Sequence, residues 1–159
     1  MSTLPPTVRT TSLALLAAGA VVSLSGCGMV QSFLGAGNVM DLEVGDCFTE
    51  SEMNSALSGT EITDVPVVEC TEPHDSEFFH SEILPDGDFP GDDAVRTTGE
   101  EVCQGAAFTE FVGVEWEESE VYASFLSPIE QGWDLGDREI LCYVIVAEPV
   151  SESLEGAGR

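Results

Sequence analysis

The stretch REILCYVIVAE, residues 138–148, is the most apolar of the segments that resemble strands, and it decides the fold. Its β-branched and aromatic side chains follow one another without glycine or proline, which is typical of a buried β-strand. A strand buried on both faces requires other elements on both sides of it. We therefore expect residues 138–148 to form a central strand of a sheet.

Four further segments have strand character, and the polar stretch SEMNSALSGTE, residues 51–61, is expected to be a loop. In the strand EFFHSEIL, alternation places Phe79 and Ile83 on one face with Glu77 and Ser81. The four segments are residues 40–48, 62–70, 77–84 and 121–126.

Two helices are predicted between the later strands. Thr98 and Glu101 have the spacing of a capping box, and Gly113 is a stop signal for the helix that this box would begin. The segment SPIEQGWDLG indicates a short helix with Ser127 as its N-cap. The fold class is therefore α+β, with a mainly antiparallel sheet of four to five strands, one longer and one short helix, and two disulfides.

The N-terminal segment has the features of an export signal. An apolar run of about a dozen residues, too short for a membrane-spanning helix of roughly 20, follows Arg9 and ends in LSGC. The sequence LSGC resembles the bacterial lipobox, in which small residues precede a cysteine that is lipidated. We therefore expect Cys27 to be lipidated with long acyl chains such as palmitate, and to hold the protein on the outer face of the cytoplasmic membrane.

Four cysteines remain in the exported part, and an even number in an oxidising compartment indicates two disulfides. Three connectivities are possible. We favour Cys47–Cys70 and Cys103–Cys142, because each pair joins segments expected to be neighbouring elements. No CxxC pair supports a zinc or redox centre.

The expected organisation is a signal peptide, a tether, one domain and a disordered tail. Beyond the signal peptide, the chain has three arginines and 30 acidic residues, and it contains no lysine. Nucleic-acid binding needs basic residues, so it is excluded, and anionic lipid would repel this domain. Calcium binding by so acidic a domain is an open alternative. The four parts are residues 1–26, 27–40, 41–148 and 149–159.

The segment TEPHDSE contains the candidate site residues His74 and Asp75. The favoured interpretation is a connection between strands, in which Asp75 accepts backbone N–H bonds and His74 braces the loop. A metal site or a hydrolase centre using His74 and Asp75 is the alternative. No HExxH, HxH or GxSxG motif supports that alternative, so no catalytic residue, metal or cofactor is assigned.

Trp133, Asp137 and Arg138 form the other candidate motif. An isolated arginine among so many carboxylates is expected to make a bidentate contact with Asp137, Asp75 or Asp46. Binding of an anionic ligand by Arg138 is the alternative interpretation.

Several motifs, in this order, resemble the septum-formation-related domain of actinobacterial exported proteins and lipoproteins. They are LEVGDCF, VPVVECTEPHDSE, a cysteine before FVG, and GWDLGDREILC. The resemblance covers residues 41–147 and implies a role in the division septum or the envelope, without catalytic residues to transfer. We therefore expect a non-catalytic binding domain whose partner is an envelope or division protein.

Overall fold

The computed structural model describes residues 41–58 and 65–159. The predicted signal peptide, the predicted lipidation site Cys27 and the predicted tether lie outside the described residues. Within those residues no helix combines the length and apolar character needed to cross a membrane.

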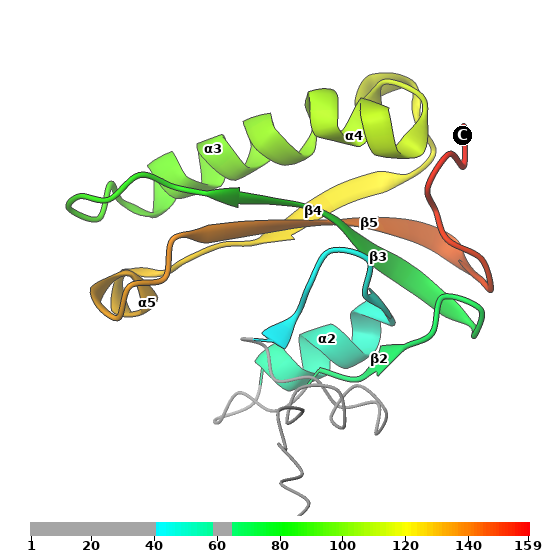
Figure 1. Ribbon diagram of the computed structural model, residues 1–159, viewed down its shortest axis with the longest axis horizontal. Coiled ribbons are helices and arrows are strands. Elements are labelled where there is room, and N and C mark those ends of the chain that lie inside the picture. Colours follow the sequence, from blue (N-terminus) through cyan, green and yellow to red (C-terminus); the bar gives the residue numbers. More distant parts are fainter. Residues whose placement is uncertain (1–40, 59–64) are drawn as a thin grey trace, which may run out of the picture.

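The core of the fold is a five-stranded sheet in which every neighbouring pair is antiparallel, in the order β2-β1-β3-β5-β4 (Figure 1). The long strands β3 and β5 pair over most of their length, and the short strands lie outside them. The strands are β1 (Cys47–Phe48), β2 (Val67–Val68), β3 (His74–Ile83), β4 (Tyr122–Leu126) and β5 (Glu139–Val150). This agrees with the predicted α+β class.

Helices cover both faces of the sheet. Figure 1 shows α3 and α4 along one face, α2 on the other, and α5 at one end of β5. A short 3-10 helix, η3, precedes β4. The helices are α2 (Glu50–Leu57), α3 (Asp92–Cys103), α4 (Ala106–Val112), η3 (Trp116–Glu118) and α5 (Glu130–Asp134).

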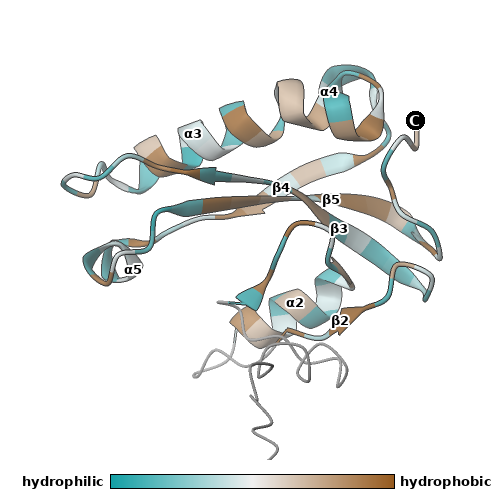
Figure 2. Cartoon of the chain, viewed as in Figure 1, coloured by the Kyte–Doolittle hydropathy of each residue, from teal (hydrophilic) through white to brown (hydrophobic). Residues whose placement is uncertain are grey.

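Strand β5 supplies side chains to two hydrophobic clusters, one on each face of the sheet. Ile140 and Val144 face the cluster under α3 and α4, whereas Leu141 and Tyr143 face the cluster under α2. Because both faces are covered, the strand is apolar at consecutive positions, as its colouring in Figure 2 shows. The sequence prediction of an interior strand is confirmed.

Both predicted disulfides are present. Cys47 is bonded to Cys70 and Cys103 to Cys142, with Cα–Cα distances of 5.3 and 5.4 Å. The first links β1 to the segment between β2 and β3. The second links the end of α3 to β5, so each disulfide joins neighbouring elements.

Three details of the predicted helices are wrong. Residues 51–57, which lie in the stretch expected to be a loop, belong to α2 (Glu50–Leu57), whose only buried side chains are Met53 and Ala56. The longer helix begins after Gly91, and Thr98 lies inside it, where its hydroxyl donates to the carbonyl of Ala94 at 3.0 Å. Helix α5 begins after Ile129, so Ser127 is not its N-cap. The predicted stop at Gly113 is correct, because this glycine has a φ of +95° at the end of α4.

The prediction of a disordered tail is also wrong. Strand β5 continues to Val150, and Leu154 is buried in the cluster under α3 and α4. The backbone N–H groups of Gly156 and Gly158 donate to the carbonyls of Phe111 and Val112 at the end of α4, at 2.7 and 2.8 Å. The tail is ordered because these carbonyls, unpaired at a helix end, need donors.

Candidate functional site

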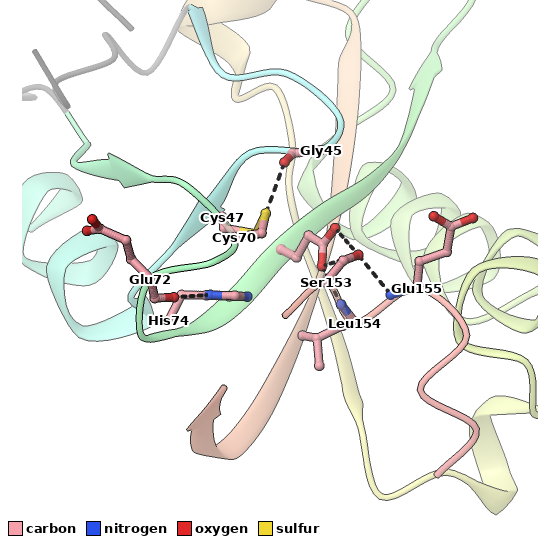
Figure 3. The surroundings of a disulfide bond; sticks show 9 residues. Gly45, Cys47, Cys70, Glu72, His74, Ser153, Leu154 and Glu155 are labelled. Atoms are coloured by element: carbon pink, nitrogen blue, oxygen red, sulfur yellow. Dashed lines mark hydrogen bonds between the residues drawn. A yellow bond between two sulfur atoms is a disulfide. The ribbon is translucent and has the colours of Figure 1, made fainter. Parts of the chain in front are cut away.

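A cluster of four chemically active side chains lies where β1, β3 and the Cys47–Cys70 disulfide meet (Figure 3). Two sulfur atoms, one ring nitrogen of His74 and one carboxylate oxygen of Glu77 all lie within 4.8 Å of one another. Cys47 and Glu77 are directly opposite each other in the β1–β3 ladder. The pairing of β3 and β5 shifts register between His74 and Ser76, and such a bulge redirects side chains.

His74 is the first residue of β3 and is 1% exposed. Its Nδ1 lies 2.8 Å from the carbonyl oxygen of Glu72, and Figure 3 shows the other ring nitrogen turned away from that carbonyl. A carbonyl only accepts, so Nδ1 carries the proton in this contact. Nε2 is buried without a hydrogen-bond partner among the described residues. The expectation that His74 braces the loop is therefore met by its contact with Glu72.

Glu77 is a buried carboxylate, 4% exposed, held by the C-terminal tail. Its Oε1 and Oε2 lie 2.8 and 3.1 Å from the Ser153 hydroxyl, and Oε2 accepts the backbone N–H of Leu154 at 2.6 Å. Figure 3 shows Ser153 and Leu154 beside the disulfide. A buried carboxylate is stabilised by such donors, which is why this polar tail packs here.

Asp75, in contrast, lies in β3 and hydrogen-bonds to the start of α2. Its Oδ1 accepts the backbone N–H of Glu50 at 2.7 Å and the hydroxyl of Ser76 at 2.9 Å. The N-cap residue of α2, Thr49, makes no side-chain capping bond. Asp75 therefore satisfies one of the unpaired donors at the helix N-terminus from a neighbouring strand. The prediction that Asp75 accepts a backbone N–H is correct, although the donor lies 25 residues earlier.

Trp133 and Arg138 form a separate unit at the far end of β3 and β5. The guanidinium carbon of Arg138 lies 3.9 Å from the centroid of the Trp133 ring, and Nη1 donates to the carbonyls of Trp133 and Asp137, both at 2.7 Å. Its Nε lies 3.6 Å from a single oxygen of Asp86. The predicted bidentate pair with Asp137, Asp75 or Asp46 is wrong, because Nη1 donates to two carbonyls and the guanidinium stacks on an aromatic face. The buried Nε has no hydrogen-bond partner among the described residues.

Buried contacts hold this second unit in place. Trp133 is 5% exposed, and its Nε1 donates to the carbonyl of Gly87 at 2.8 Å. Phe89 packs on the same indole, with ring centroids 5.6 Å apart. Trp133 and Arg138 thus attach the loop after β3 to α5. Asp137 accepts the backbone N–H of Glu139 at 3.1 Å and stabilises the start of β5.

Two pKa values are displaced by burial elsewhere in the domain. Desolvation raises the pKa of Asp46 above its ordinary value, and the nearby Glu43 charge adds to the effect. The backbone N–H of Glu43, which donates to Oδ2 at 2.9 Å, opposes it. Burial likewise raises the pKa of Tyr143, and a hydrogen bond with Ser124 partly opposes this shift.

The structure does not bring the two predicted candidate motifs together: Trp133, Asp137 and Arg138 contact one another, but not His74 or Asp75. His74 starts β3 and Arg138 lies beyond its other end, roughly 30 Å apart at the usual rise per strand residue. His74 and Asp75 also bond to different partners. With its sulfurs joined, the buried cluster offers only His74 and Glu77 as metal ligands, fewer than the three or four of a zinc site.

Sequence reasoning did not identify Glu77, Ser153 and Leu154 as parts of one buried site. The available signal was the alternation in β3, which placed Glu77 on the same face as Phe79. Because Phe79 is buried under α4, a carboxylate on that face needs a covering donor. His80, the second histidine, is not part of the cluster, and its Nε2 lies 3.9 Å from Glu82.

Comparison with known proteins identifies the chain through one family. The family model described as "Septum formation" matches residues 44–159, which includes the tail and all four disulfide cysteines. No curated protein and no solved structure matches. The resemblance inferred from the sequence motifs is thus confirmed, and the chain belongs to the septum formation family.

Proposed function

We propose that this protein is a lipid-anchored component of the cell envelope that acts in septum formation through a non-catalytic binding domain. Family membership supports the link to the septum. The export signal and the lipobox cysteine, Cys27, support anchoring on the outer face of the cytoplasmic membrane. The domain binds a protein of the envelope or of the division machinery.

The observation that carries the non-catalytic proposal is the placement of the candidate catalytic residues. His74 is buried, and Asp75 is bonded to the N-terminus of α2. Arg138 is stacked on Trp133 at the other end of the sheet. A hydrolase needs a nucleophile, a base and an oxyanion site within hydrogen-bond reach of one another. Here Asp75 is already bonded to α2, and Arg138 lies at the far end of the sheet from His74.

The charge of the domain supports anchoring by acyl chains rather than by the protein surface. Residues 41–159 carry 30 acidic residues and three arginines. Anionic lipids repel such a surface within about one Debye length, near 8 Å at physiological salt. One acyl chain gives only reversible attachment, so stable anchoring requires two or more chains on Cys27.

Anchoring is tested by growing cells with an alkyne fatty acid and isolating the protein. We expect label on the wild-type chain and none on Cys27→Ser, with Cys27→Ser lost from the membrane fraction. Equal labelling of both chains would contradict the assignment of Cys27.

The alternative, a small envelope hydrolase using His74 and Asp75, is tested with Asp75→Asn. Asparagine keeps an acceptor oxygen for the N–H of Glu50 but removes carboxylate chemistry. In cells that lack the native protein, we expect Asp75→Asn to restore division as fully as the wild type. Failure of Asp75→Asn, with an unchanged melting temperature and membrane level, would favour the hydrolase.

A further inference from the structure

We propose that the reduced form of this domain binds one Zn²⁺ through Cys47, Cys70, His74 and Glu77. Zinc and the Cys47–Cys70 disulfide would then be alternative cross-links at the same place in the fold. The ligand atoms of these four residues already lie within 4.8 Å of one another. This site is independent of the proposed anchoring and septal functions.

The hydrogen bond of His74 leaves one ring nitrogen free to bind a metal ion. Its Nδ1 donates to the carbonyl of Glu72 at 2.8 Å, which leaves the lone pair of the neutral ring on Nε2. That nitrogen is buried and has no hydrogen-bond partner within residues 41–58 and 65–159. Zinc-binding histidines have this same arrangement, in which the second ring nitrogen donates to a carbonyl or carboxylate and fixes the tautomer. A buried ring nitrogen without a partner is costly unless a ligand completes it.

Glu77 supplies an oriented carboxylate. The hydroxyl of Ser153 and the N–H of Leu154 fix its position, at 2.8 and 2.6 Å. A carboxylate has about four acceptor positions, so these two donors leave room for a metal. Among the described residues, no arginine forms an ion pair with Glu77. A bound cation would therefore neutralise a buried charge that now has only hydrogen-bond donors.

The two sulfurs complete the site only after reduction, because zinc binds thiolates. Tetrahedral zinc with bonds of about 2.0–2.3 Å places its ligand atoms about 3.3–3.8 Å apart. The nitrogen and oxygen need to approach by about 1.5 Å at most, and the sulfurs need to move apart by rotation of the cysteine side chains. The Cα atoms of Cys47 and Cys70, 5.3 Å apart, already lie close enough to serve one ion.

A two-electron oxidation converts the zinc site into the disulfide. A disulfide oxidant takes two electrons from the two zinc-bound thiolates, its own S–S bond breaks to give two thiolates, and the Cys47–Cys70 bond forms. The Zn²⁺ ion, left with His74 and Glu77 alone, is released to solvent. In this scheme zinc holds β1 against β3 in a newly exported chain and protects its thiols until oxidation.

The proposal is tested on the full chain carrying Cys27→Ser, purified in detergent, which removes the fifth thiol. Samples oxidised in air or reduced with a phosphine are titrated with Co²⁺, and zinc competition then gives the affinity. We expect the reduced chain to bind one equivalent with a thiolate-to-cobalt band, and the oxidised chain to bind none. His74→Ala and Glu77→Gln should each weaken zinc binding about tenfold or more.

The second disulfide provides the matched control. In the reduced state, Cys103→Ser/Cys142→Ser keeps only the proposed thiols, and we expect it to bind cobalt as the parent does. Cys47→Ser/Cys70→Ser keeps only the other pair and should show no thiolate band. If reduction unfolds the chain, zinc should restore the circular dichroism spectrum of the first variant alone. No thiolate band in the reduced parent, equal binding by both variants, or unchanged affinity in His74→Ala would overturn the proposal.

Discussion

Replacing Leu154 with alanine tests whether the C-terminal tail is part of the folded core. Leu154 is 1% exposed and packs in the same cluster as Phe108 and Val112 of α4. Its backbone N–H donates to Glu77, and this bond remains in the alanine variant. The substitution Leu154→Ala therefore removes side-chain packing and leaves the polar contact of the tail in place.

The expected loss is that of a large-to-small change in a core. Replacing a fully buried leucine with alanine lowers the free energy of unfolding by about 2–5 kcal/mol, because transfer free energy is lost and a cavity is left behind. A domain of this size loses about 4 °C in melting temperature for each 1 kcal/mol. We therefore expect the melting temperature to fall by roughly 8–20 °C.

Thermal unfolding followed by circular dichroism measures the change, with Leu135→Ala as the matched control. Leu135 is 84% exposed, so the same substitution there should change the free energy of unfolding by less than about 0.5 kcal/mol. Equal melting temperatures for the two variants would mean that the tail does not pack on α4. That result would refute the structural role assigned to the tail.

Three further predictions concern other single residues. Asp75→Ala should lower the free energy of unfolding by about 0.5–2 kcal/mol in urea titrations, because the N–H of Glu50 loses its acceptor, whereas Asp75→Asn should lower it less. Asp46→Asn should raise the melting temperature at pH 7. Because the pKa of Asp46 is raised in the native state, the native state binds this proton more tightly than the unfolded state, and stability falls as the pH rises through that pKa. At pH 7 the ionised Asp46 therefore destabilises the native state, and asparagine removes that cost. The gain should vanish near pH 3, and a gain there as large as at pH 7 would contradict this explanation. Gly99→Ala should destabilise the domain by about 1–3 kcal/mol, because a Cβ at this position would clash with the ring of Phe125, and an increase in stability from better helix propensity alone would contradict this packing.

The sheet was largely predictable from the sequence because its signals are local. Strand β5 is apolar at successive positions. The simple alternation expected for β3 is wrong, because residues 76–79 are all buried, Ile83 is 65% exposed, and the pairing with β5 shifts register between Phe78 and His80. The disulfide pairing followed once the strands were placed. Helix α2 was missed because only Met53 and Ala56 are buried on it, which leaves a weak amphipathic pattern, and because its N-terminal donor is satisfied by Asp75 from another element.

The buried cluster was not predictable because it depends on contacts between distant residues. Ser153 and Leu154 bond to Glu77 across 76 and 77 residues, and nothing in the polar sequence SESLEGAGR indicates this docking. The predicted partner of Arg138 was wrong for a related reason. The acidic composition favoured a carboxylate partner, but the tertiary structure places Trp133 and two carbonyls beside the guanidinium.

Locating the chain in dividing cells tests the central functional claim most directly. An antibody against the domain would compare the wild type with Cys27→Ser, because both carry the same folded domain. We expect the wild type to be concentrated at the division septum and Cys27→Ser to lose that position together with membrane attachment. An even distribution of the wild type along the envelope, or septal enrichment that persists in Cys27→Ser, would contradict a lipid-anchored septal function.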